Sequence, residues 1–289
     1  MHRRLAVIAV CLGAMGSAGA AFGADSYRFE DFRADGFSAA PAPGALDSNR
    51  FRVMGASAGP MNFGDSRLTG DFARGAAVGP VSTGGVYAFD VSRGGADPNF
   101  AFGFQPTGSD FSPGGIEFRW TNRGPAMVDA IQIDYELLQR NNGGRSSAID
   151  FYLVDQAADA GAATGTPGGP VVGASKTFGS ARVVSPGPAD PVGTWAAVSR
   201  SLVIDNLALA PQQSVVVGWR HTDLGGSGAR DEFALDDLSV AMLRFIPEPA
   251  TGLLTLVCGS IVPWAARTRR RRGLRHEDGA ADPDGTAGC

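Results

Sequence analysis

Apolar residues recur at every second position along much of this chain, and few windows show the repeat of an amphipathic helix. The run 115–120, Gly-Ile-Glu-Phe-Arg-Trp, alternates apolar and polar side chains as a half-buried strand does. Similar runs rich in branched and aromatic residues span 127–138, 148–154, 196–204 and 214–220. Turn-forming residues separate them, at 122–125, 141–144, 210–211 and 224–228. Strands at this spacing predict an all-β fold, an antiparallel β-sandwich.

The apolar positions of these runs define the expected core of the sandwich. The residues predicted to be buried are Phe29, Phe118, Trp120, Ile131, Ile133, Phe151, Leu153, Val217, Trp219, Leu235 and Leu238. The best helix candidate is 155–163, but its glycine- and proline-rich continuation to residue 169 favours a long exposed loop.

The N-terminus has the order of a secretory signal peptide. A charged segment at 2–4 precedes an apolar run at 5–10, and small residues continue to residue 22. We predict a signal helix over 1–23, with a retained N-terminal anchor as the alternative. Either Ala-Gly-Ala at 18–20 or Ala-Phe-Gly at 21–23 supplies a cleavage pattern.

The C-terminus carries an apolar run, 250–266, followed by arginines. As a helix these seventeen residues would span roughly 25 Å, slightly less than the roughly 30 Å hydrocarbon core of a bilayer. We predict a marginal transmembrane helix with the arginine cluster 267–272 on the cytoplasmic side. A buried core helix with a solvated basic patch is the alternative, and so many arginines suit a domain interior poorly. The acidic segment 273–289 is expected to be a disordered tail.

A Pro-Glu-Pro triplet before this apolar run and arginine cluster resembles the PEP-CTERM sorting signal of Gram-negative bacteria. The resemblance covers 247–272 and implies recognition by exosortase, a membrane transpeptidase-like enzyme, in species that make exopolysaccharide. It implies that the exported domain, 24–246, reaches the cell envelope or is secreted after transient anchoring in the inner membrane. The sorting residues that it assigns are Pro247, Glu248, Pro249, Arg267, Arg269, Arg270, Arg271 and Arg272.

Cysteine content and charge narrow the function classes of the exported domain. The three cysteines are Cys11, Cys258 and Cys289, so 24–246 contains no disulfide, cysteine nucleophile or cysteine metal site. Residues 25–244 hold 24 acidic and 17 basic side chains, a net charge near −7. Nucleic-acid binding normally needs a basic surface and is not expected.

The two ends of the exported domain, 26–32 and 231–240, are similar to the first and last strands of MAM-like and carbohydrate-binding jelly rolls. The resemblance implies that these strands lie side by side in a jelly-roll-like sandwich and that a structural cation binds where they meet. Ca²⁺ takes six to eight oxygen ligands, and Glu30 with Asp236 or Asp237 could supply two carboxylates. Ordinary surface acids are the alternative. Because Asp236 and Asp237 are adjacent on an expected strand, we predict that they point to opposite faces.

Few residues of the exported domain have the pattern of a catalytic site. His221 is its only histidine, and although Asp223 follows closely, no Gly-x-Ser-x-Gly elbow accompanies it. A lone histidine at a strand end indicates a structural or surface residue. Among the tryptophans, Trp120 and Trp219 are in phase with core positions, whereas Trp195 follows a loop and is the candidate glycan contact, with core packing favoured for all three as the alternative.

These observations favour a non-enzymatic, exported β-sandwich with a structural or adhesive role in an exopolysaccharide or biofilm matrix. A carbohydrate-binding module is the first alternative, and an exposed aromatic row with polar neighbours would favour it. A glycan-active hydrolase is the second, and it would need two carboxylates facing one cleft or His221 hydrogen-bonded to a serine.

Overall fold

The computed structural model describes residues 22–92, 97–154, 174–187 and 193–243. The chain divides into two compact units, Met1–Arg244 and Phe245–Cys289. Every described strand, with its pairings and its core contacts, belongs to the first unit, which therefore carries a core of its own. No helix among the described residues is long and apolar enough to cross a membrane. The expected apolar span, the sorting motif and the C-terminal tail lie outside the described residues, as do the first 21 residues of the signal peptide and the helix candidate 155–163.

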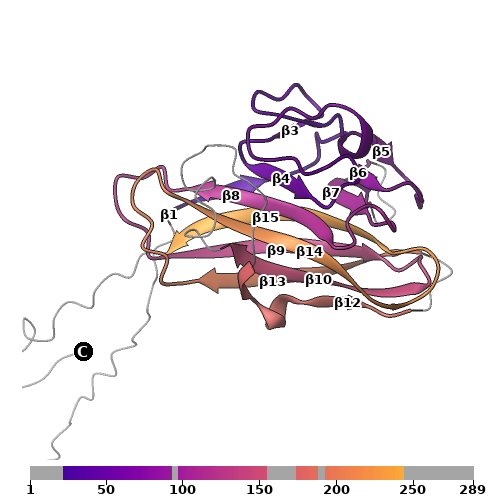
Figure 1. The fold of residues 1–289 in the computed structure, drawn as a ribbon. Helices are drawn as coiled ribbons and strands as arrows, with labels where there is room; N and C mark the ends of the chain where they lie inside the picture. The colour runs from indigo at the N-terminus through magenta and orange to yellow at the C-terminus, as the bar shows by residue number, and fades with distance from the viewer. Residues whose placement is uncertain (1–21, 93–96, 155–173, 188–192, 244–289) are drawn as a thin grey trace, which may run out of the picture. The chain divides into compact units, whose positions relative to one another are not determined.

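Seven strands form the first sheet (Figure 1). Along the sheet they are β13 (Trp195–Ile204), β9 (Ala130–Arg140), β15 (Glu232–Leu243), β7 (Phe100–Gln105), β6 (Gly85–Asp90) and β5 (Ala76–Ala77), with β1 (Phe22–Tyr27) paired to β15. All neighbours are antiparallel except β5 and β6. β15 pairs with β9 on one side and with β7 and then β1 on the other.

Six strands form the second sheet, and all their pairings are antiparallel. Its strands are β11 (Ala174–Thr177), β10 (Arg145–Val154), β14 (Ser214–Gly226), β8 (Gly114–Thr121) and β4 (Phe51–Met54), with β12 (Val183–Ser185) also paired to β10. A short parallel pair, β2 (Phe37–Ser38) and β3 (Leu46–Asp47), lies apart from both sheets. The helical turns among the described residues are two 3-10 segments, η1 (Gly70–Phe72) and η2 (Gly179–Ala181). The all-β prediction is therefore confirmed.

The two sheets share one hydrophobic core, because alternate residues of both contribute to a single buried cluster. Phe102 of the first sheet packs edge-on against Phe51 of the second, with ring centroids 5.5 Å apart. Ten of the eleven residues predicted to be buried are buried, and Leu153 is half-buried while packing against the same cluster. The alternation in the sequence thus reports the inward faces of the strands correctly.

The first and last strands lie side by side, as the jelly-roll resemblance implies, although the first strand is 22–27 and not the predicted 26–32, of which only Ser26 and Tyr27 are in the strand. β1 pairs with β15 so that Ser26 is opposite Ser239 and Tyr27 is opposite Leu238. The pairing begins at Phe22, so two residues of the predicted signal peptide, Phe22 and Gly23, lie in β1. The N-terminal strand therefore closes the sheet against the last strand of the same unit.

Candidate functional site

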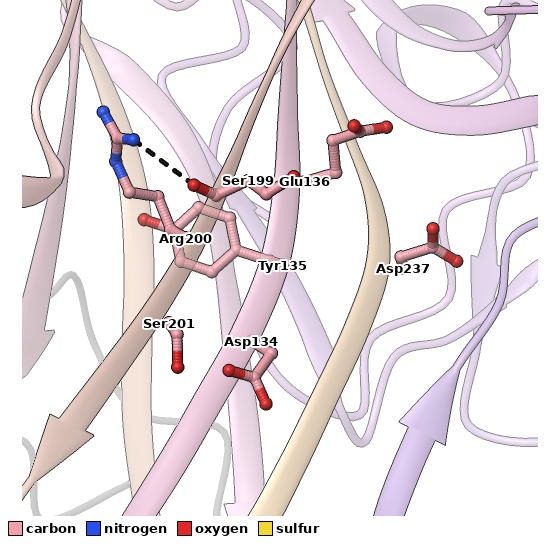
Figure 2. A pocket seen from close by; sticks show the side chains of 7 residues that line it. All are labelled: Asp134, Tyr135, Glu136, Ser199, Arg200, Ser201 and Asp237. Carbon is pink, nitrogen blue, oxygen red and sulfur yellow. Dashed lines mark hydrogen bonds between the residues drawn. The ribbon is translucent and has the colours of Figure 1, made fainter.

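A hollow of about 380 Å³ lies on the first sheet, across three neighbouring strands (Figure 2). The exposed or half-exposed side chains that line it are Asp134, Glu136, Ser199, Ser201 and Asp237, and Tyr135 and Arg200 complete its lining. Strand register sets this arrangement, because Ser199 is directly opposite Glu136 and Ser201 is directly opposite Asp134. In an antiparallel pair, directly opposite residues share a face. The hollow therefore gathers three carboxylates and two hydroxyls on the outer face of the sheet.

A β-bulge brings Asp237 to this hollow. In the β9–β15 pairing, Asp236 is opposite Glu136 and Ser239 is opposite Asp134, so β15 has one extra residue between the two pairs. Asp237 is at this extra position, and its φ of +48° is in the left-handed region. Asp236 shares the outer face with Glu136, and the exposed Asp237 lines the hollow on that face. The prediction that the two aspartates point to opposite faces is wrong, because the bulge interrupts the alternation on which it rested.

Asp236 is buried beside the hollow, in contrast to Asp237. Its Oδ2 accepts a hydrogen bond of 3.0 Å from Asn99 Nδ2, and its Oδ1 accepts one of 2.9 Å from the Asp237 backbone N–H. Burial raises the pKa of Asp236, and the nearby carboxylates of Asp237 and Glu136 raise it further. Asp236 therefore supports the backbone of the bulge and does not line the hollow.

The residues expected to bind calcium are not gathered into one cluster. Glu30 is exposed and pairs with Arg28 at 3.3 Å, and it is not among the residues that line the hollow. Within the described ranges, no group of three or more His, Cys, Asp or Glu side chains is arranged to hold a metal ion. Calcium binding by Glu30 with Asp236 or Asp237 stays a prediction.

Trp195 begins β13 and lies on the same face of that strand as Ser199, four residues further on. The tryptophan is half-buried: its ring centroid is 5.2 Å from that of Phe89, and the guanidinium carbon of Arg140 is 4.4 Å from the centroid of its ring. Its Nε1 donates to the carbonyl oxygen of Asp90 at 3.1 Å. These contacts fix the ring in a small apolar cluster on the outer face of the first sheet. A glycan contact at Trp195 stays a prediction, whereas Trp120 and Trp219 are buried in the core.

Sequence reasoning missed a buried acidic pair at the start of β15. Glu232 accepts hydrogen bonds from Arg140 Nη1 at 2.7 Å and from the Val81 backbone N–H at 2.5 Å. Asp231 accepts a hydrogen bond of 2.7 Å from the Gly143 backbone N–H and another from the Ser185 hydroxyl. Burial raises the pKa of both carboxyls, to about 6 for Asp231, although Arg140 opposes the shift at Glu232. The two acids therefore hold separate loops at one end of the sandwich through hydrogen bonds. In the sequence, the only sign of this pair is that two acids are adjacent at the start of an expected strand.

His221 is buried and points into the protein. Its Nδ1 lies 2.6 Å from the carbonyl oxygen of Phe111, so this nitrogen carries the hydrogen, and burial lowers the pKa of the imidazole. Its Nε2 is 3.8 Å from Asp223 Oδ1, while Asp223 accepts hydrogen bonds from Arg230 at 2.6 to 3.0 Å. In the described part of the chain, no hydrogen bond joins His221 to a serine.

No protein-family model matches the chain, and no curated protein sequence is similar to it. Solved structures that match the chain include the carbohydrate-binding module TmCBM61 in complex with β-1,4-galactotriose, with 13% identity and a TM-score of 0.28 over 56% of this chain and 87% of that one. The xylan-binding CBM22-1 domain of Paenibacillus barcinonensis Xyn10C has 9% identity and a TM-score of 0.34, over 80% and 99%. The non-crystalline-cellulose-specific module CBM28 has 12% identity and a TM-score of 0.29, over 54% and 78%. All three TM-scores are below 0.5, and galactotriose, xylan and cellulose are ligands of those three proteins.

Proposed function

We propose that this chain is an exported, non-enzymatic β-sandwich of the jelly-roll type with an adhesive role in an exopolysaccharide or biofilm matrix, and that the hollow of its first sheet binds glycan. The observation that carries the proposal is the lining of the hollow, three carboxylates and two serine hydroxyls on one outer face. Sugar hydroxyls donate well to carboxylates, and such charge-assisted hydrogen bonds are about twice as strong as neutral ones. Serine hydroxyls can both donate and accept.

The position of these groups suits recognition. Asp134 and Glu136 alternate along β9, and their partners Ser199 and Ser201 lie directly opposite on β13. Binding groups on strands hold their geometry better than groups on loops. A glycan lying across the two strands could therefore contact several fixed polar groups at once.

The position of Asp236 favours binding over hydrolysis. Glycoside hydrolysis needs a carboxylic acid that is protonated beside the scissile bond and a second, ionised carboxylate. Asp236 has a raised pKa, but it is buried, holds Asn99, and does not line the hollow. We therefore infer that the hollow holds a glycan without cleaving it.

Export and sorting rest on the two ends of the sequence. The signal peptide would direct the chain across the inner membrane, and the run 250–266 would anchor it there until exosortase acts at the Pro-Glu-Pro triplet. A glycan-binding sandwich released in this way would lie among the polysaccharides that such bacteria export.

A structural calcium ion is part of the proposal. Thermal melts of the 22–244 chain with calcium and with a chelator test it, because a ligand that binds only the folded state raises the midpoint. The Glu30→Ala and Asp237→Asn variants locate the site. Loss of the calcium-dependent shift in the thermal midpoint in these variants supports a site between the first and last strands. An unchanged midpoint in the unmodified chain contradicts calcium binding.

The test of glycan binding is a pull-down of the 22–244 chain on insoluble neutral polysaccharides and on a glycan array, with release of reducing ends measured in parallel. We expect retention on at least one glycan and no release of reducing ends. Retention on none contradicts the proposal, and release of reducing ends supports the hydrolase alternative.

A further inference from the structure

The outer edge of β13 differs from the other sheet edges. β13 pairs with β9 over ten residues, and within the described ranges no strand pairs with its other side. The remaining edge strands are shorter: β1, which pairs with β15 alone among the described strands, has six residues, β5 has two, β12 three, and β4 and β11 four each. Very short edge strands are one way in which native proteins prevent edge-to-edge pairing. β13 lacks that protection.

The composition of β13 also suits pairing. Its ten residues include one charged side chain, Arg200, although residues 25–244 carry a net charge near −7. Ser199 and Ser201 are exposed, and Val203 is 51% exposed. Unpaired N–H and C=O groups on such an edge are a template for another strand. Repulsion between two copies of this acidic chain would be smallest at a strand that contains no acid.

We propose that β13 pairs with β13 of a second copy of this chain, antiparallel about a two-fold axis at Ser199, so that the first sheets of two copies become one continuous sheet. In this register Trp195 of one copy is opposite Val203 of the other, and the half-exposed ring covers an exposed aliphatic side chain. Aromatic and β-branched residues directly opposite each other stabilise an antiparallel pair.

Arg200 disfavours an axis at its own position. With Ser199 on the axis, Arg200 is opposite Val198, whereas an axis at Arg200 would place two guanidiniums directly opposite each other, which destabilises the pair. An axis between the two residues would set inward and outward side chains opposite each other, which the pleat forbids. Arg200 remains occupied within its own strand, where its Nη1 donates to the Ser199 carbonyl oxygen at 3.3 Å (Figure 2). Since Ser199 lines the hollow, the pair would place two hollows on one continuous face.

A cysteine pair tests this register in the 22–244 chain, which contains no cysteine of its own. On the axis, two copies of Ser199→Cys have Cα atoms about 4.5–5.5 Å apart, within the range of a disulfide. In the matched control, Ser201→Cys, the two cysteines are offset by four residues, about 13 Å along the strands. Both positions are exposed, so both thiols are equally accessible.

The variants are incubated at micromolar concentration in a glutathione redox buffer, and the covalent dimer is measured by non-reducing electrophoresis. We expect at least ten-fold more disulfide-linked dimer from Ser199→Cys than from Ser201→Cys, and a reversible dimer of the unmodified chain in sedimentation equilibrium. Equal cross-linking of the two variants, more from Ser201→Cys, or none from either overturns the proposal. The glycan pull-down of the unmodified 22–244 chain is a separate measurement, and its outcome does not depend on this result.

Discussion

Arg140 and Glu232 form a buried ion pair across the β9–β15 pairing, with the Arg140 Nη1 and Glu232 Oε2 atoms 2.7 Å apart and side-chain exposures of 4% and 0%. Glu232 also accepts a hydrogen bond from the Val81 backbone N–H, and Arg140 lies over the ring of Trp195. The pair therefore connects two strands of the first sheet, a loop and the tryptophan at the start of β13.

Removing one partner of this pair is expected to destabilise the domain strongly. In Glu232→Ala, the guanidinium of Arg140 stays buried without its carboxylate, and breaking such a pair costs about 3–5 kcal/mol. Urea unfolding of the 22–244 chain measures this loss. The control is Glu30→Ala with both variants measured in the presence of a chelator, where it removes only an exposed pair with Arg28 and should change the free energy of unfolding by less than about 1 kcal/mol. Similar losses in both variants contradict the structural role of the buried pair.

Asp231 is expected to make the domain less stable as the pH rises through the weakly acidic range. Its pKa in the folded protein is raised to about 6, from an ordinary value of 3.8, chiefly because the carboxyl is buried. The folded state thus binds the proton more tightly, so this contribution to stability is complete below about pH 4 and is lost as the pH rises to about 6. Each unit of difference in pKa corresponds to about 1.4 kcal/mol.

Urea unfolding between pH 4 and pH 7 tests the role of Asp231. As the pH rises across this range, the free energy of unfolding of the unmodified chain should fall relative to that of Asp231→Asn. A difference that is constant with pH would show that Asp231 does not titrate between these values.

Gly218 is expected to be required by the ring of Tyr152 on the neighbouring strand. A Cβ at Gly218 would lie 2.5 Å from Cζ of that ring, whose hydroxyl donates to the buried Glu117. Gly218→Ala should therefore lower the free energy of unfolding by about 1–3 kcal/mol, the usual cost of overpacking. In a double-mutant cycle with Tyr152→Ala the cost should largely disappear. A cost that is the same in both backgrounds would place the strain elsewhere.

The pairing of β1 predicts where the mature chain begins, and the sorting motif predicts where it ends. Signal cleavage after Ala20 leaves β1 intact from Phe22, whereas cleavage after Gly23 removes the Phe22 pairing with Met242. We therefore expect a mature N-terminus at Ala21 and a C-terminus near Pro247, measured by intact mass spectrometry of the exported protein. Secreted protein that still carries the arginine cluster 267–272 contradicts exosortase processing.

The sequence predicts the strands and the core well because alternation along one strand depends on that strand alone. The buried Phe118 and Trp120 of β8 are examples. The prediction that Asp236 and Asp237 point to opposite faces is wrong because the bulge arises from a mismatch in register between β15 and β9. These two strands are about one hundred residues apart in the sequence. The Arg140–Glu232 pair was missed for the same reason, since its partners are 92 residues apart. Features that depend on register between distant strands are not visible in a single strand's pattern.

Isothermal titration with a soluble oligosaccharide of the polysaccharide retained in the pull-down tests most directly whether the hollow on the first sheet binds glycan. The double variant Asp134→Asn, Glu136→Gln keeps the size of the lining side chains and removes two charges, and the exposed Asp31→Asn is the control outside the hollow. Hydrogen bonds to charged groups contribute about 1.5–3 kcal/mol, so we predict at least ten-fold weaker binding for the double variant and unchanged binding for the control. Unchanged affinity in the double variant would contradict the assignment of the hollow as the glycan site.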